Sequence, residues 1–118
     1  MRDHRKLQAF QLADAFVLDV YRQTRAFPRE EIYGLTAQLR RAAVSVAANI
    51  VEGCGRETSK EYVRFLSIAL GSLREAGYYV DLAHRLSYLT QAAFDDLNEK
   101  YDHASRVLSR LIKSRSHE

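Results

Sequence analysis

Apolar residues recur at intervals of three and four along most of this chain, a spacing that places them on one face of an α-helix. The first such pattern spans residues 5–26 and ends at Phe27-Pro28. Because proline disfavours helical backbone in the residue before it, the sequence predicts a helix over 5–26 that ends at this pair. Its predicted buried stripe comprises Leu7, Phe10, Leu12, Ala13, Phe16, Val17, Val20 and Thr24.

A second helix is predicted from about Pro28 to Gly53. Proline is favourable in a first helical turn, where its missing N–H would have no partner in any case. The segment Gly53-Cys54-Gly55 predicts the end of this helix, because either glycine can adopt the left-handed conformation that closes one. The expected buried stripe is Ile32, Leu35, Leu39, Ala43, Val46 and Ile50.

A third helix is predicted from residue 59 to about Leu86. Thr58 and Glu61 match a capping box, in which a hydroxyl caps the helix and a glutamate three residues later bonds back. Gly71 and Gly77 lie inside the helix at a cost of about 1 kcal/mol each relative to alanine, so we expect another helix to approach closely there. The inward positions are Tyr62, Phe65, Leu66, Ala69, Leu73, Ala76, Val80 and Ala83.

A fourth helix is predicted to begin at Thr90, with a heptad seam formed by Phe94, Leu97, Tyr101, Ala104, Leu108 and Leu111. The connections between the predicted helices are short, which makes consecutive helices antiparallel. Proline occurs once and glycine five times in 118 residues, as is typical of long helices. The sequence therefore predicts an all-α fold, an up-down-up-down antiparallel four-helix bundle in which residues 1–118 form a single domain.

Composition and missing motifs narrow the possible functions. Cys54 is the one cysteine, which excludes an internal disulfide framework and a cysteine-rich zinc module. No apolar run approaches the roughly 20 residues of a membrane span, and charged residues directly follow Met1. No phosphate-binding glycine loop or His-Glu-x-x-His motif occurs. We therefore expect a cytoplasmic, non-enzymatic protein with no catalytic residue, cofactor, bound metal or membrane contact.

Charge is distributed unevenly between the two ends of the predicted bundle. Acidic residues gather at predicted helix starts and basic ones at helix ends, as helix dipoles favour. The topology brings the start of the first helix, the turn between the second and third, and the end of the fourth to one end, where nine basic residues face five acidic ones. These basic residues are Arg2, Arg5, Lys6, Arg56, Lys60, Arg106, Arg110, Lys113 and Arg115. Such an end suits contacts with nucleic-acid phosphates, and equally suits solubility alone.

Polar residues also share one face of the second and third predicted helices. They are Gln38, Arg41, Ser45, Asn49 and Glu52 on the second helix, and Ser72 and Glu75 on the third. We expect Arg41, Asn49 and Glu75 to form a partly buried hydrogen-bonded network that serves the structure or a subunit contact. The alternative, Glu75 as a general acid or base, has no accompanying histidine or nucleophile.

Two segments resemble a known family. Residues 33–53 contain the elements Gln38-Leu39-Arg40-Arg41-Ala42-Ala43 and Asn49-Ile50-Val51-Glu52-Gly53 in order after Phe27-Pro28, and a second block covers residues 65–75. These segments are similar to the four-helix-bundle proteins encoded in intervening sequences of bacterial 23S rRNA, over nearly the whole chain. The matching residues are Gln38, Arg40, Arg41, Ser45, Asn49, Glu52, Gly53, Ser72 and Glu75.

The resemblance implies several properties of the protein. Members of that family look like small bundles that assemble into homo-oligomeric rings, of five subunits, without established catalytic activity. Their fold is similar to that of the accessory protein of diversity-generating retroelements, which implies a role in binding nucleic acid or a reverse transcriptase.

Two hypotheses about function follow. In the first, a non-enzymatic homo-oligomer binds RNA or other nucleic acid through its basic end, and a ring multiplies weak sites by avidity. In the second, the polar stripe and exposed tyrosines such as Tyr78 dock a protein partner, and no nucleic acid is bound.

Overall fold

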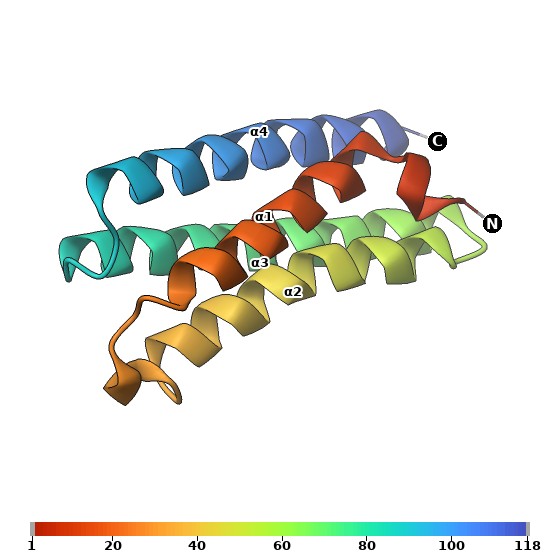
Figure 1. Ribbon diagram of the computed structural model, residues 1–118. Helices are drawn as coiled ribbons and strands as arrows, with labels where there is room; N and C mark the ends of the chain where they lie inside the picture. The colour runs from red at the N-terminus through yellow and green to blue at the C-terminus, as the bar shows by residue number, and fades with distance from the viewer. Residues whose placement is uncertain (1, 118) are drawn as a thin grey trace.

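The computed structural model describes residues 2–117, which form four α-helices and two short 3₁₀ turns; Met1 and Glu118 lie outside the described residues. The helices are α1 (Gln8–Thr24), α2 (Leu35–Cys54), α3 (Ser59–Arg85) and α4 (Gln91–Arg115), and the turns are η1 (His4–Lys6) and η2 (Arg29–Glu31). Each helix runs antiparallel to the one before it in an elongated bundle of 45 × 24 × 20 Å (Figure 1). The predicted all-α four-helix bundle is confirmed.

The core is made from the helix faces that the apolar spacing predicts. Seven of the eight predicted inward residues of α3 are buried, and Phe65 alone among them stays partly exposed. The largest fully buried side chains are Tyr62, Phe16, Leu39, Ile50, Leu66, Leu73, Leu97 and Leu108. Full burial of one such apolar side chain stabilises the fold by about 1.5–3 kcal/mol, so the four stripes together hold the bundle closed.

The start of the second helix was predicted wrongly. Residues 29–31 form a 3₁₀ turn, and α2 begins only at Leu35. The carboxylate of Glu31 accepts a hydrogen bond from the backbone N–H of Leu35 at 3.1 Å and another from the hydroxyl of Tyr88 at 2.8 Å. Glu31 therefore caps α2 and ties it to the α3–α4 connection. Ile32, a predicted core residue, precedes the helix and is 53% exposed.

Two other boundaries differ from the sequence-based prediction. The chain begins with η1 rather than with a continuous helix, because Asp3 accepts the N–H of Arg5 and caps that short turn. α2 ends at Cys54, within the predicted glycine segment. The predicted left-handed closure is absent at Gly55, which has right-handed backbone with φ at −84°. Within residues 2–117 the one residue with clearly positive φ is Ser87, after α3, with φ at 64°.

The two glycines inside α3 have different surroundings. A Cβ atom on Gly77 would lie 2.4 Å from the ring of Tyr101, so this glycine allows α4 to approach α3 closely, as predicted. A Cβ atom on Gly71 would meet nothing within 4 Å, and Gly71 is exposed. The prediction of a close helix contact within the chain is therefore wrong at Gly71.

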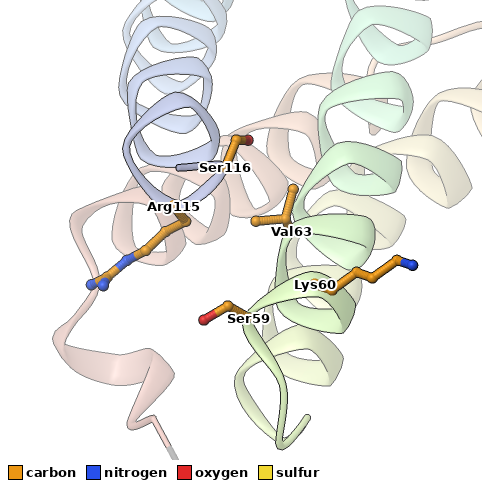
Figure 2. A pocket seen from close by; sticks show the side chains of 5 residues that line it. All are labelled: Ser59, Lys60, Val63, Arg115 and Ser116. Atoms are coloured by element: carbon orange, nitrogen blue, oxygen red, sulfur yellow. The ribbon is translucent and has the colours of Figure 1, made fainter. Parts of the chain in front are cut away.

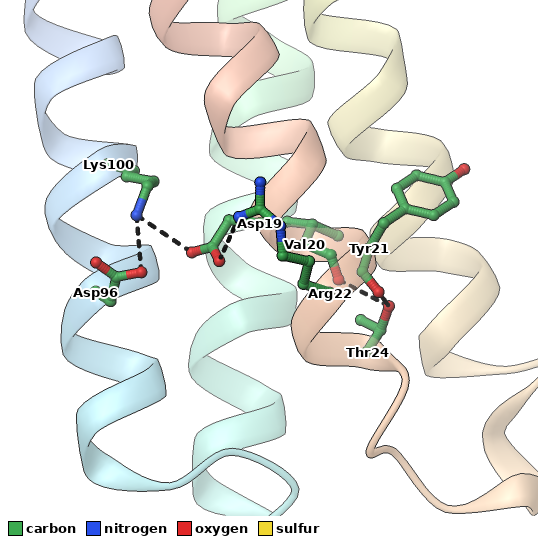
Figure 3. A network of polar contacts seen from close by, with 7 residues as sticks. All are labelled: Asp19, Val20, Tyr21, Arg22, Thr24, Asp96 and Lys100. Atoms are coloured by element: carbon green, nitrogen blue, oxygen red, sulfur yellow. Dashed lines mark hydrogen bonds and ion pairs between the residues drawn. The ribbon is translucent and has the colours of Figure 1, made fainter.

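A buried carboxylate connects α1 to α4. The side chain of Asp19 is 4% exposed, and Nζ of Lys100 lies 3.4 Å from its Oδ2 and 2.7 Å from Oδ2 of Asp96 (Figure 3). Arg22 contacts the other oxygen of Asp19 at 3.7 Å. The bond from Lys100 lowers the pKa of Asp96, and the same contact raises the pKa of Lys100. Lys100 therefore compensates a carboxylate that the core removes from water.

Candidate nucleic-acid interface

The basic end assembles as the topology predicts. The N-terminal segment, the end of α2, the start of α3 and the end of α4 lie together at one end of the bundle (Figure 1). Segments far apart in sequence therefore bring their cationic side chains to a common surface. The side chains differ in whether they are free to meet a ligand.

Arg2 is used in contacts within the chain. Its backbone N–H donates to the carbonyl of Cys54 at 3.1 Å, and its guanidinium donates to the carbonyl of Arg56 at 3.3 Å. The same guanidinium lies 3.9 Å from the centroid of the buried Tyr62 ring. Arg2 thus fastens the N-terminal segment to the α2–α3 turn, which sequence reasoning did not foresee.

Two further predicted residues are ion-paired. Nε of Arg5 lies 3.0 Å from a carboxylate oxygen of Asp3, and this bond lowers the pKa of Asp3. Arg56 pairs with Glu52 and lies over the ring of Phe65. Glu52, which the sequence placed on the polar face of the second helix, therefore neutralises part of the basic end.

A stripe of unpaired cations follows α4. Arg106, Arg110 and Lys113 are exposed, and none has a carboxylate within ion-pair distance in residues 2–117. Their spacing of four and three residues places them on one face of the helix, over about 10 Å of its length. Lys6 and Lys60 are also exposed and outside every ion pair that this part of the chain makes.

A groove separates the start of α3 from the end of α4. It encloses about 310 Å³ and is lined by Ser59, Lys60, Val63, Arg115 and Ser116. Figure 2 shows Arg115 extending from α4 on one side of the groove, whereas Lys60 points away on the other side. The two cations flank the groove and do not converge on a single point within it. This arrangement suits an extended polyanion that passes across the surface rather than one enclosed phosphate.

The predicted polar stripe divides into two groups. Ser45 and Ser72 join α2 to α3 through their hydroxyls at 2.9 Å, and the amide of Asn49 donates to the carbonyl of Ser45 at 2.8 Å. This group is partly buried. It contains neither Arg41 nor Glu75, so the expected network of Arg41, Asn49 and Glu75 does not form.

The second group is exposed and centres on a residue that the sequence analysis missed. The hydroxyl of Tyr79 contacts Glu75 at 2.7 Å and Gln38 at 3.1 Å, and Gln38 also accepts a bond from Arg41 at 3.4 Å. The contact with Glu75 raises the pKa of Tyr79. The spacing of four residues between Glu75 and Tyr79 was the available signal, since such pairs are neighbours on a helix.

Arg40, matched only through the family resemblance, fastens α1 to α2. Its Nε donates to the hydroxyl of Thr24 at 2.8 Å, and a second guanidinium nitrogen donates to the carbonyl of Tyr21 at 3.4 Å. Arg40 thereby satisfies groups at the C-terminus of α1, where helix carbonyls have no partner within the helix. Its part in the fold is structural.

In residues 2–117 no group of three or more His, Cys, Asp or Glu side chains could hold a metal ion. Cys54 is buried, and burial raises the pKa of its thiol, which keeps it protonated near neutral pH. None of the helices in this range is long and apolar enough to cross a membrane.

Comparisons with known proteins agree with this architecture. The model of the family described as 23S rRNA-intervening sequence protein matches residues 5–110. A crystal structure of a protein with unknown function from the S23 ribosomal protein family of Bacteroides thetaiotaomicron VPI-5482 superposes with a TM-score of 0.82. That structure shares 22% sequence identity and covers 89% of this chain and 98% of its own. A search of curated proteins found no match. The matched family model spans nearly all of α1 to α4, and the chain belongs to the 23S rRNA-intervening sequence protein family.

Proposed function

We propose that this protein is a non-enzymatic, homo-oligomeric, cytoplasmic nucleic-acid-binding protein that contacts structured RNA through its basic end. The observation that carries the proposal is the stripe of Arg106, Arg110 and Lys113 on α4. These cations have no internal carboxylate partner in the described part of the chain, so a phosphate contact would not require an existing ion pair to break. Lys6 and Lys60 extend the same electrostatic surface.

Binding to structured RNA is expected to weaken steeply as salt rises. Each phosphate neutralised by a lysine or arginine releases counterions, and the logarithm of affinity then falls by about 0.7–0.9 per tenfold increase in salt. Five unpaired cations therefore predict a slope of about −3.5 to −4.5 for one subunit. The measurement is fluorescence anisotropy with fragments of 23S rRNA, and with unrelated duplex DNA, from 50 to 300 mM salt. Flat binding curves with both probes at 50 mM salt would refute the proposal.

The outer face of α2 and α3, defined by Val44, Val51, Ile68, Gly71 and Tyr78, is the surface that we assign to self-association. Its four larger side chains are each 38–56% exposed although they are apolar or aromatic. Gly71 leaves room on this face for another helix backbone, and none of residues 2–117 uses that room. Exposed apolar surface of this kind marks interaction sites.

Charge on this face favours a second copy of the chain as its occupant. Arg74 and Arg41 lie there together with Glu75, so the face offers both signs of charge. In a ring each subunit presents this face to a different face of its neighbour, and a surface with both signs of charge can pair there with groups of either sign. The family resemblance, which implies rings, supports the same occupant.

Gly71→Ala is expected to have opposite effects on folding and on assembly. Alanine in an exposed helix is favoured over glycine by about 1 kcal/mol, and the added methyl meets no atom of its own chain. The subunit itself should become more stable, whereas the methyl should obstruct the approaching subunit and raise the dissociation constant of the oligomer. Analytical ultracentrifugation measures the second effect and urea unfolding of the dissociated chain the first. An oligomer that tightens in this variant would place the contact elsewhere.

A second candidate function is a scaffold that binds a different protein through the same α2–α3 face. The exposed ring of Tyr78, which lies beside Tyr79 with centroids 5.8 Å apart, favours it. The two candidates predict different oligomeric states for the purified protein, which its mass in solution distinguishes. A chain that stays monomeric at 100 μM, and that does not bind RNA, would favour the scaffold.

A further inference from the structure

A second cationic site lies at the end of the molecule opposite the basic end. A pocket of about 240 Å³ opens between the end of α1, the connection that follows it and the start of α2. Its cationic lining residues are Arg25, Arg29 and Arg40, and its apolar lining includes Phe27 and Ile32. No carboxylate lines it.

One of the three guanidinium groups is already fixed in place. Arg40 donates from Nε to Thr24 and from a second nitrogen to the carbonyl of Tyr21, and its guanidinium carbon lies 4.7 Å from the centroid of the Tyr21 ring. An arginine held by two bonds and an aromatic ring loses little conformational entropy when it meets a ligand. Arg25 and Arg29 are exposed and have no ion pair within residues 2–117.

A threonine of α2 also lines the pocket. Thr36 is 5% exposed as a residue, and its hydroxyl makes no hydrogen bond among the described residues. The hydroxyl can therefore donate to a ligand in the pocket without breaking an existing bond. Thr36 also lies in the first turn of α2, where Gly34 at the N-cap has no side chain to offer and Glu31 reaches the N–H of Leu35. The Glu31 carboxylate therefore already offsets the positive end of the α2 dipole, and the cationic character of the pocket rests on its arginines.

Three carboxylates at this end are paired with cations. The ion pairs join Asp19 and Asp96 to Lys100, Asp19 to Arg22, and Asp81 to Arg85. Glu31 bonds to Leu35 and Tyr88, and Glu30 and Glu99 are in no ion pair within residues 2–117. None of these acids lines the pocket, so the local charge of its lining comes from arginines alone.

We propose that the pocket lined by Arg25, Arg29, Arg40 and Thr36 binds a phosphate group. Guanidinium forks match phosphate oxygens bidentately, and a hydroxyl donates a further bond. Phe27 and Ile32 provide an apolar wall beside that group, and the volume suits a phosphate with a small attached moiety. The same chemistry is offered by a small phosphate monoester and by the terminal phosphate of a nucleic acid. This site is separate from the basic end and does not depend on RNA binding there.

The test is a titration of the ¹⁵N-labelled chain with inorganic phosphate at constant ionic strength, followed by NMR. We expect saturable shifts of the Thr36 amide and of the Arg40 Nε resonance. In Arg29→Gln the dissociation constant should rise by about tenfold, as expected for loss of one charge-assisted bond. Arg85→Gln is the matched control, since this arginine lies at the same end but is paired with Asp81, and it should bind phosphate as the wild type does.

Thr36→Val separates binding from folding. Valine has nearly the same shape and lacks the unpaired hydroxyl, so the unliganded chain should unfold at the same or a higher temperature while phosphate binding weakens by about tenfold. Absence of saturable shifts at Thr36 and Arg40, or equal affinity in the wild type, Arg29→Gln and Thr36→Val, would overturn the proposal.

Two further probes identify the source of the phosphate. Displacement of inorganic phosphate by ribose 5-phosphate would assign the pocket to small phosphate monoesters. Displacement only by a short RNA with a 5′-phosphate, and not by the same RNA with a 5′-hydroxyl, would assign it to a nucleic-acid terminus. Either result supports a phosphate site. A 5′-hydroxyl RNA that displaces phosphate as well as the 5′-phosphorylated one would show general polyanion attraction and overturn it.

Discussion

Replacing Arg110 and Lys113 with glutamine is expected to reduce affinity for structured RNA by about 25- to 60-fold at 0.1 M salt. The estimate follows from counterion release, in which each lost phosphate contact removes about 0.7–0.9 decades of affinity at that concentration. The slope of log affinity against log salt should become shallower by about 1.4–1.8. Both side chains are exposed on α4 and make no ion pair within residues 2–117, so the fold should be unaffected.

A matched control removes two arginines from the other end. Arg22→Gln with Arg85→Gln changes the net charge by the same amount, and both side chains are more than half exposed. RNA affinity and its salt dependence should stay within about twofold of the wild type, because the effect of these charges on the distant basic end is screened. If the two double variants lose affinity equally, binding responds to net charge, and the α4 stripe is not the contact surface.

Replacing Lys100 with methionine is expected to lower the free energy of unfolding by about 2 kcal/mol. Removing one partner of a fully buried ion pair typically costs about 3–5 kcal/mol. The lysine side chain is 33% exposed and Arg22 remains near Asp19, so the smaller value applies. Urea unfolding followed by circular dichroism measures the loss. Lys113→Met, on an exposed part of the same helix, is the control and should change stability by less than about 0.5 kcal/mol.

The double variant Asp19→Asn with Lys100→Met tests the cause. Neutralising the buried carboxylate removes the uncompensated charge, so the double variant should recover more than half of the lost stability. A double variant no more stable than Lys100→Met alone would mean that the lysine acts through its contact with Asp96 or through packing.

The difference between the wild type and Lys100→Met should depend on pH at both extremes. The pKa of Asp96 is lowered in the folded chain, so its contribution is present above the unfolded value near 4 and disappears as pH falls through the folded one. The pKa of Lys100 is raised, so its contribution is present below about 10.4 and disappears as pH rises through the folded value. The difference should therefore be largest between about pH 5 and pH 10.

The bundle itself was predictable because its information is local. Helical spacing of apolar residues identified every core face, and Thr58 and Thr90 do cap α3 and α4 through bonds to Glu61 and Ala93. A capping bond spans three residues, so sequence contains it directly. Antiparallel order followed from short connections, and that order alone brought the basic segments to one end.

The uses of individual polar side chains were decided by tertiary structure. The sequence placed Arg2 at the basic end and gave Arg40 no contact. In the structure each donates hydrogen bonds to a backbone or hydroxyl oxygen of another segment. Asp19 is one turn from Arg22, but its burial depends on α4 and on Lys100, far along the chain. Such contacts join residues that are far apart in sequence, so the spacing of residues within one helix does not predict them.

The amino-acid sequence by itself determined the helices, their order, the core faces and the family, because periodicity, caps and motifs are properties of neighbouring residues. Only the tertiary structure decided which cations remain unpaired and which glycine is left open. It also placed three arginines around one pocket at the end opposite the basic end. The physical reason is that a charge acts through its neighbours in space, and these neighbours can come from helices far apart in sequence, as Asp19 and Lys100 do.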